Sequence, residues 1–291
     1  MIVDAHHHVW TLGAHDYSWL DDPPYLPLRR TFGLSDLLPE LRAAGVGRTV
    51  LVEAGSGAVA ETEDFLALAA ASPVVAGVVG TVDLTDPSLG DVLDRLRARP
   101  GGDRLVGLRH QLQAIRDPAF FDRPDVHDNL RLVADRGLVY DLVVRPDQLP
   151  ACETLLRAAP GLRYVLDHLG KPDLTGGLRA LRSWRGSLES LARLPNVTAK
   201  LSGLLTQADP ARWATADLRP AVETAVELFG YERLMFGSDW PVCLLAADYG
   251  QVLAATRDAL PPMTPDQREL VFGGTAQRVY RLEVAQPGRA G

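Results

Sequence analysis

The sequence predicts a (β/α)8 TIM barrel, one α/β domain in which eight parallel strands alternate with helices. Short runs rich in Val, Ile and Leu recur along the chain, and such runs are typical of parallel strands that are buried on both faces. Segments with apolar residues at helical spacing separate these runs. The length of 291 residues suits a single barrel of this class, which typically needs about 250 residues.

Each expected strand is followed by a segment with a helical pattern. The strands are expected at 2–5, 48–53, 74–82, 105–112, 137–144, 162–167, 197–201 and 233–237. The helices are expected at 35–44, 60–71, 87–99, 125–136, 149–159, 184–194, 219–229, 249–260 and 265–271. An open doubly wound sheet is the alternative, but no glycine-rich phosphate loop follows the first strand.

Two segments fall outside this alternation. Residues 11–33 are predicted to form a long structureless loop, and loops of this length are usually binding loops or lids. The tail from Glu283 is rich in Gly, Pro and Ala and is expected to be frayed. We therefore place one TIM-barrel domain at residues 1–282, followed by the tail at 283–291.

Composition excludes several classes of partner. The net charge of −7 and the lack of a Lys/Arg-rich run argue against nucleic acid. No apolar stretch approaches the roughly 18 residues of a membrane span, and a strand that begins at residue 2 leaves no room for a targeting peptide. Cys152 and Cys243 lack metal-site spacing and are expected to be reduced thiols. A cytoplasmic monomer or homodimer is the expectation.

The stretch Asp4-Ala5-His6-His7-His8 opens the chain. Because side chains alternate between the faces of a strand, Asp4, His6 and His8 are expected on one face and His7 on the other. Two imidazoles beside a carboxylate can hold a metal or position a water. A purification tag and an exposed polar run are the alternatives for this stretch taken alone.

Polar residues gather at the carboxyl ends of the predicted strands, where barrels build their active sites. They are His6, His8, Glu53, Arg109, His110, Gln111, Asp141, Arg145, Asp167, His168, Lys171, Lys200, Ser202, Ser238, Asp239 and Trp240. Both lysines of this Arg-rich chain fall in the set. On an ordinary solvated surface, residues that are rare in the chain would not be expected to cluster at one end of a barrel.

Each of these residues has an alternative structural role. Arg109 and Arg145 can be ion-pair partners at the strand ends, and Asp141 can pair with an arginine or cap a loop. Glu53 can simply accept backbone hydrogen bonds, and His110 can pack against its neighbours.

Alternation along the strand implies that one of Asp167 and His168 points away from the barrel interior. We favour His168 as the functional member of this pair. Asp239, at the end of the last strand, is the residue hardest to explain as surface.

Taken together, these motifs resemble those of the amidohydrolase superfamily (amidohydrolase 2 type), in its branch of sugar-lactone hydrolases. The motifs that carry the resemblance are 4–10 (DAHHHVW), 107–113 (GLRHQLQ), 167–172 (DHLGKP), 200–204 (KLSGL) and 236–242 (FGSDWPV). The resemblance extends from about Val3 to Leu282 and implies a hydrolase that opens a sugar lactone to the sugar acid.

The resemblance also implies roles for individual residues. One divalent metal, most naturally zinc, would bind at His6, His8, His168 and Asp239, although this branch also works without metal. Asp239 would be the general base on water, with His168 and Arg109 as its catalytic partners. Substrate contacts would come from Lys171, Lys200, Trp10, Trp19, Trp240, His110 and Arg145.

Two rival functions stay open. One is a pyrone-carboxylate (aromatic) lactonase or a decarboxylase of the same superfamily. The other is a barrel that binds sugar without catalysis. No Ser-His-Asp or Gly-x-Ser-x-Gly arrangement offers a covalent route.

Overall fold

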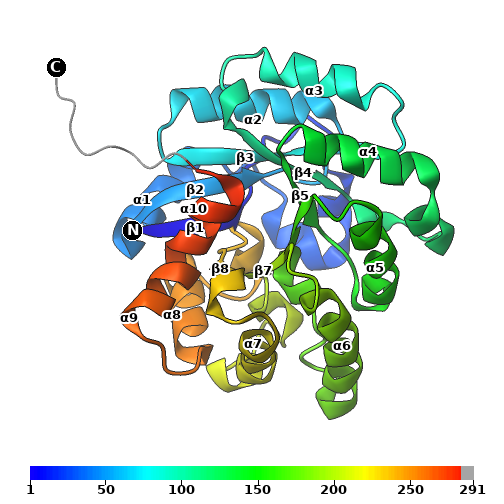
Figure 1. Cartoon of the computed structure of the whole chain (residues 1–291). Coiled ribbons are helices and arrows are strands. Elements are labelled where there is room, and N and C mark those ends of the chain that lie inside the picture. Colours follow the sequence, from blue (N-terminus) through cyan, green and yellow to red (C-terminus); the bar gives the residue numbers. More distant parts are fainter. Residues whose placement is uncertain (283–291) are drawn as a thin grey trace.

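The computed structural model describes residues 1–282 and contains eight parallel strands arranged in a nearly closed barrel (Figure 1). The strands are β1 (Ile2–His7), β2 (Val46–Val52), β3 (Val75–Thr81), β4 (Leu105–His110), β5 (Val139–Leu142), β6 (Arg163–Leu166), β7 (Val197–Leu201) and β8 (Leu234–Phe236). Each strand pairs with the next. The His7–Trp240 bridge joins the segment after β8 to β1, which confirms the predicted barrel and excludes the open sheet.

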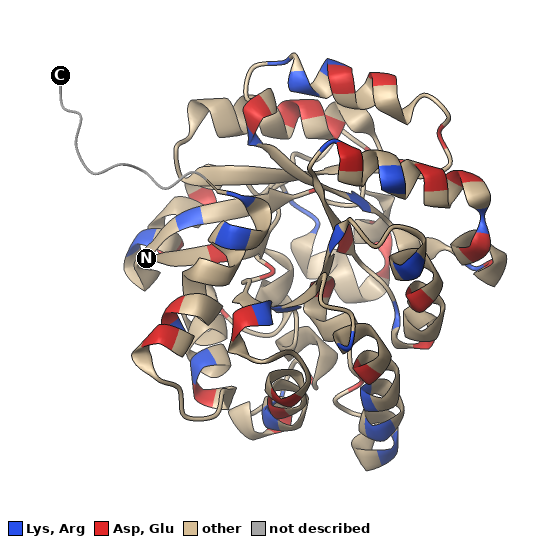
Figure 2. Cartoon of the chain, in the orientation of Figure 1, with Lys and Arg blue, Asp and Glu red and all other residues tan. Residues whose placement is uncertain are grey.

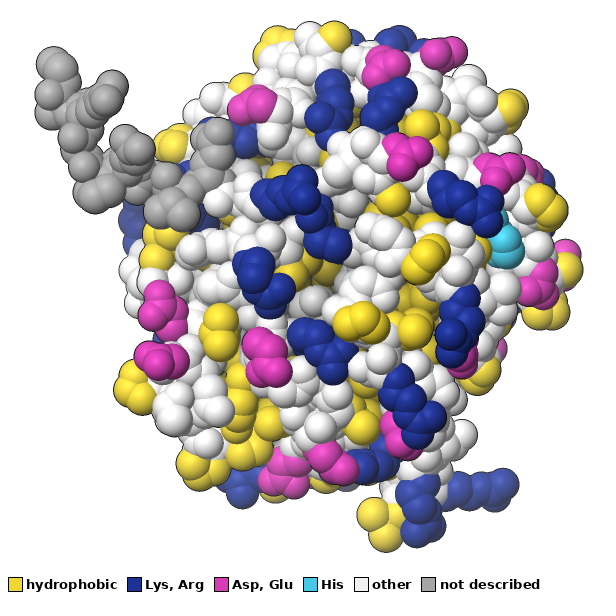
Figure 3. Space-filling model, in the orientation of Figure 1, with side chains coloured by type: hydrophobic (Ala, Val, Ile, Leu, Met, Phe, Trp, Pro, Cys, Tyr) yellow, Lys and Arg dark blue, Asp and Glu magenta, His cyan; other side chains and the backbone are white. Residues whose placement is uncertain are grey.

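Helices surround the strands on the outside of the barrel (Figure 1). They are α1 (Leu34–Ala44), α2 (Val59–Ala71), α3 (Leu89–Arg97), α4 (Pro124–Asp135), α5 (Leu149–Ala158), α6 (Gly177–Ala192), α7 (Thr215–Phe229), α8 (Tyr249–Ala259), α9 (Pro265–Glu269) and α10 (Thr275–Tyr280). Charged residues belong mainly to these outer helices (Figure 2). Figure 3 shows side chains of both signs scattered over the visible face.

Two apolar clusters hold the layers together. The larger cluster packs the helices against the outer faces of the strands. The smaller one joins strand residues such as Val3, Val165 and Met235 to Val279 and Tyr280 of α10. The last helix therefore packs against the barrel strands themselves, and the polar ends of the strands are left for the site.

The β1 strand departs from the expected alternation. Its pairing with β2 shifts register between Asp4 and His7, and such a bulge turns following side chains to a different face. The Asp4 carboxylate accepts a hydrogen bond from Tyr249 of α8, whereas His6 contacts Lys200 of β7. The expectation that Asp4 shares a face with His6 is wrong for this reason.

Residues 11–33 are more ordered than expected. They contain 3-10 turns at Ser18–Asp21 and Pro23–Leu28. The reason is aromatic packing, because Trp19 lies with its ring centroid 5.5 Å from Trp10 and 5.1 Å from Tyr25. This segment is therefore an ordered, packed loop at one side of the barrel opening.

Helix boundaries differ most near the C-terminal part of the barrel. Helix α6 begins at Gly177, ahead of the expected start at Trp184. The expected final helix is divided into α9, a π-helical turn at Leu270–Gly274 and α10.

Cys152 and Cys243 are both free and buried. Within residues 1–282, no helix has the length and apolarity needed to cross a membrane. The predicted tail from Glu283 lies outside the described residues.

Candidate active site

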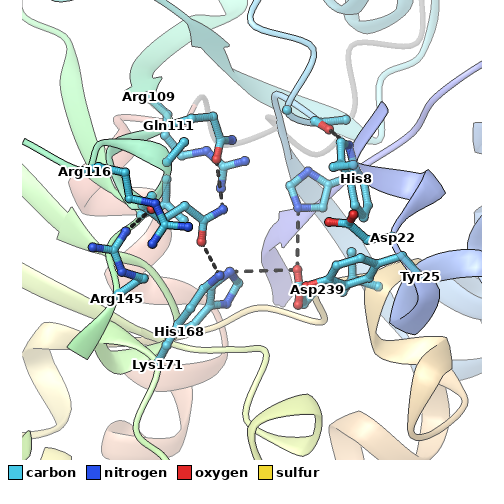
Figure 4. Close-up of a pocket in the computed structure, with 17 residues that line it drawn as sticks. His8, Asp22, Tyr25, Arg109, Gln111, Arg116, Arg145, His168, Lys171 and Asp239 are labelled. Atoms are coloured by element: carbon cyan, nitrogen blue, oxygen red, sulfur yellow. Dashed lines mark hydrogen bonds and ion pairs between the residues drawn. The ribbon is translucent and has the colours of Figure 1, made fainter. Parts of the chain in front are cut away.

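A cavity of about 540 Å³ opens at the carboxyl ends of the strands. Several of its residues directly follow a strand, as His8 follows β1 and Ala54 lies just beyond β2. Its lining consists of His8, Trp19, Asp22, Tyr25, Ala54, Gly55, Arg109, Gln111, Gln113, Ala114, Arg116, Val143, Arg145, His168, Lys171, Asp239 and Val242. Figure 4 shows His8 and His168 directed at Asp239.

Three histidines and one carboxylate meet at the base of this cavity. The Asp239 Oδ1 atom lies 3.5 Å from His8 Nε2, 3.7 Å from His6 Nε2 and 3.9 Å from His168 Nε2. The Nε2 atoms of His6 and His8 are 3.2 Å apart. All four side chains are buried, so the sequence-predicted centre does assemble.

Polar partners at the Nδ1 atoms fix the orientation of the His8 and His168 imidazoles. His8 Nδ1 lies 2.9 Å from the Val52 carbonyl oxygen and His168 Nδ1 lies 2.8 Å from Ser202 Oγ. A carbonyl oxygen only accepts hydrogen bonds, so the His8 Nδ1 atom carries the proton and its Nε2 atom is an acceptor.

The spacing of the donors fits a divalent metal. His6, His8 and Asp239 form one group of possible ligands, with one atom from each lying within 4.8 Å of the others. A tetrahedral zinc ion with bonds of about 2.0–2.1 Å holds its ligand atoms about 3.3 Å apart. The separations of 3.2, 3.5 and 3.7 Å among these three residues are close to that value.

Backbone conformation brings His168 to the centre. β6 ends at Leu166, and His168, Leu169 and Lys171 then adopt positive φ angles of 55°, 52° and 56°. This run ends the strand alternation, so Asp167 reaches His6 and His168 reaches Asp239. The expectation that one of Asp167 and His168 points away is wrong.

Gly203 leaves the space that this arrangement requires. Its φ is +62°, and an added Cβ would lie 2.6 Å from His168 Nδ1 and 3.1 Å from Asp239 Oδ2. A side chain at this position would displace both groups.

Burial and local charge set the protonation of the centre. Burial disfavours the charged form of Asp239, but the neighbouring His168, with smaller contributions from His6 and His8, outweighs this effect and holds the pKa of Asp239 below its ordinary value. Burial lowers the pKa of His168 to about 4. At neutral pH the centre is thus an ionised carboxylate beside a neutral imidazole.

A chain of buried ion pairs lies behind the centre. Lys200 Nζ is 2.5 Å from Asp141 Oδ2 and 2.9 Å from Asp167 Oδ1. Arg109 continues the chain, with contacts of 3.0 Å to Asp167 and 2.5 Å to Glu53. Glu53 and Asp141 therefore act as ion-pair partners, and Lys200, which does not line the cavity, is not placed to touch substrate as the sequence had suggested.

The remaining predicted contacts divide into two groups. Trp19, Arg145 and Lys171 line the cavity, and the Lys171 ammonium donates a hydrogen bond to Gln113 Oε1 at 2.5 Å. The residues that do not line it are Trp10, Trp240 and His110. Trp10 and Trp240 are buried against Phe32, and His110 Nδ1 accepts a hydrogen bond from the Leu84 amide.

Four lining residues with polar side-chain groups were not given a role from the sequence, namely Asp22, Tyr25, Gln113 and Arg116. Asp22 and Tyr25 belong to the segment predicted to bind, but no spacing signal marked them individually. Gln113 and Arg116 follow β4 in and after a 3-10 turn, where strand alternation gives no guidance.

The fold and this centre define a barrel enzyme with a buried polar site suited to activating water. The chain belongs to the amidohydrolase family, because the family model described as Amidohydrolase matches residues 3–282. The chain is therefore a hydrolase of that family.

Its relatives cover almost the whole sequence. An L-fucono-1,5-lactonase of Burkholderia multivorans is 39% identical, with 96% of this chain and 96% of that protein aligned. An L-fucono-1,5-lactonase of Burkholderia ambifaria is 36% identical, with 97% of this chain and 96% of that protein aligned. The crystal structure of an amidohydrolase from Burkholderia multivorans with bound zinc has a TM-score of 0.91 at 36% identity, and covers 97% of this chain and 100% of its own.

Proposed function

We propose that this protein hydrolyses a sugar lactone to the corresponding sugar acid. The observation that carries the proposal is the meeting of Asp239 with three buried imidazoles, two of which, those of His8 and His168, line the cavity with it. The relatives named L-fucono-1,5-lactonase, at 39% and 36% identity over nearly the whole chain, support the lactone as the substrate class.

In the proposed reaction, water attacks the lactone carbonyl carbon while Asp239 accepts a proton from that water. Imidazole N–H groups and the Lys171 ammonium stabilise the negative charge that develops on the carbonyl oxygen. The bond from the carbonyl carbon to the ring oxygen then breaks, and protonated Asp239 returns its proton to the ring oxygen. The products are a carboxylic acid, which ionises, and a hydroxyl group.

His6, His8, His168 and Asp239 are the residues that would hold a divalent metal in this centre. A bound zinc ion would supply polarisation of the carbonyl group and a lowered pKa for bound water. The proton transfer assigned to Asp239 and the contacts of Lys171 are roles of the chain itself.

The rest of the cavity suits a small polyhydroxylated ring. Its volume of about 540 Å³ lies in the range of sites for small ligands. Trp19 and Tyr25 give it aromatic surface on which a sugar face can pack. Gln111 and Gln113 add amide groups that can bond to hydroxyls.

A panel of L- and D-sugar lactones, assayed with a pH indicator, tests this function. We expect acid release from at least one five- or six-membered sugar lactone, well above the uncatalysed rate. No release across the panel would overturn the proposal.

One observation favours a second candidate, a lactonase for a carboxylated aromatic ring. Arg116, Arg145 and Lys171 all line the cavity and could pair with carboxylates. A pyrone dicarboxylate lactone and an aromatic acid therefore belong in the same assay. Turnover of one of these, with none of the sugar lactones, would select this candidate.

A further inference from the structure

The Nδ1 atom of His6 has two charged neighbours of opposite sign. Lys200 Nζ lies 3.1 Å from it and Asp167 Oδ1 lies 3.2 Å from it. All three side chains are fully buried, so water does not screen the contacts. A neutral imidazole has one N–H donor and one acceptor nitrogen, and its surroundings decide which is which.

The geometry of the two contacts shows which nitrogen of His6 is the donor and which is the acceptor. An ammonium group can only donate, and the Lys200–His6 contact has hydrogen-bond geometry. In the described part of the chain, Asp167 Oδ1 accepts no aligned hydrogen bond, so its contact with His6 Nδ1 is not one. The acceptor nitrogen of His6 is therefore Nδ1, and the proton sits on Nε2.

The neighbouring histidine fits the same assignment. His8 Nδ1 donates to the Val52 carbonyl at 2.9 Å, which leaves His8 Nε2 as an acceptor. His6 Nε2 lies 3.2 Å from it, and a proton on His6 Nε2 makes this contact a hydrogen bond. With the other tautomer of His6, two lone pairs would face each other across the same gap.

We propose that Lys200 is a positioning residue that holds His6 in the Nε2–H tautomer and thereby weakens metal binding at the centre. A metal can bind Nε2 only after the proton moves to Nδ1, which breaks the Lys200 hydrogen bond and turns the proton toward Asp167. In the resting centre His6 instead presents an N–H group beside Asp239. The use of that N–H toward a lactone carbonyl rests on the proposed function, whereas the tautomer and the metal affinity do not.

The tautomer can be read directly from the native protein. In metal-free, full-length enzyme labelled with ¹⁵N-histidine, long-range ¹H–¹⁵N correlation spectra report which ring nitrogen carries the proton. A His6→Gln variant identifies the signals of His6. We expect Nε2–H for His6 and Nδ1–H for His8, and an Nδ1–H signal for His6 would overturn the proposal.

Zinc binding to paired variants tests the role of Lys200. Lys200→Met combined with Asp141→Asn removes one positive and one negative charge together, and Asp141→Asn alone is the matched control that keeps Lys200. We expect the double variant to show His6 in the Nδ1–H form and to bind zinc about tenfold or more tightly than the control in a chelator-competition titration. Equal zinc affinity, or Nε2–H in both variants, would contradict it. If the double variant does not fold, the native spectrum still decides.

Discussion

At the scale of single residues, Lys171 stands out as a cation in the cavity. No carboxylate forms an ion pair with it among residues 1–282, and its ammonium contacts the Gln113 amide. Burial lowers the pKa of Lys171, and a poorly hydrated ammonium interacts strongly with developing negative charge.

We expect Lys171→Met to lower kcat/KM about 100-fold, since a charged hydrogen-bond donor in an active site contributes roughly 3 kcal/mol. Arg116→Met is the matched control, because Arg116 lines the same cavity but is exposed. Steady-state kinetics on the best lactone would show a change of a few-fold for the control. Equal effects of the two substitutions would remove Lys171 from the reaction.

The residues that meet around Asp239 could be predicted from the sequence, whereas the position of Lys200 could not. His8, His168 and Asp239 follow strands, and His6 lies near the carboxyl end of β1, so the topology of a barrel brings these residues together. Lys200 lies within a strand, and spacing alone does not tell whether a residue near a strand end faces the cavity or the ion pairs beneath it. Its contacts with Asp141 and Asp167 become apparent only in three dimensions.

At the scale of elements, the closure of the barrel depends on Asp4. Its carboxylate accepts hydrogen bonds from the amide and the hydroxyl of Ser238 at 2.8 and 2.6 Å and from the Tyr249 hydroxyl at 3.0 Å. These bonds tie β1 to the segment after β8 and to α8. Because Asp239 directly follows Ser238 in the chain, these hydrogen bonds also help to hold Asp239 in the site.

We expect Tyr249→Phe to lower the free energy of unfolding by about 2 kcal/mol, because it removes a buried hydrogen bond to a charged group. Tyr231→Phe is the control, since the Tyr231 hydroxyl makes only an exposed 3.5 Å contact with the Pro262 carbonyl. Urea unfolding measures both. A loss of stability in Tyr231→Phe as large as that in Tyr249→Phe would rule out the specific role of the Asp4 contact.

The presence of the strands and helices could be predicted from the periodicity of apolar residues, but the local backbone conformation could not. The left-handed residues after β6 and the register shift in β1 depend on long-range contacts. A prediction from periodicity assumes a regular strand, and it therefore assigned the side chains of Asp4 and Asp167 to the wrong faces.

At the scale of the whole molecule, Glu61 is a source of pH-dependent stability. This fully buried residue of α2 accepts a hydrogen bond from the Ala54 amide. Burial, with a contribution from nearby Glu53, raises the pKa of Glu61 from 4.5 to about 7. The unfolded chain therefore releases this proton at lower pH than the folded protein does, and stability falls as pH rises between these two values.

We expect wild-type protein to lose about 3 kcal/mol relative to Glu61→Gln between pH 4 and pH 8, as a shift of this size implies. Glu40→Gln, at an exposed position on α1, should track the wild type throughout. Urea unfolding across this range gives the differences. A constant difference between wild type and Glu61→Gln would mean that Glu61 has an ordinary pKa.

Barrel topology, strand order and the end of the barrel that carries the site all follow from sequence pattern, because they depend on the apolar core. The walls of the cavity do not. Asp22 and Tyr25 reach it from a segment whose path is set by packing of Trp10, Trp19 and Tyr25.

The role of Asp239 as general base is tested most directly by comparing two carboxylates of one cavity. Asp239 contacts the three histidines, whereas Asp22 lines the cavity and forms no ion pair with them among the described residues. On the best sugar lactone, we expect Asp239→Asn to lower kcat by about 1,000-fold or more with the fold retained, since it removes the proton acceptor. Asp22→Asn should stay within about tenfold of wild type. An Asp239→Asn enzyme with more than a tenth of wild-type kcat would show that Asp239 is not the general base.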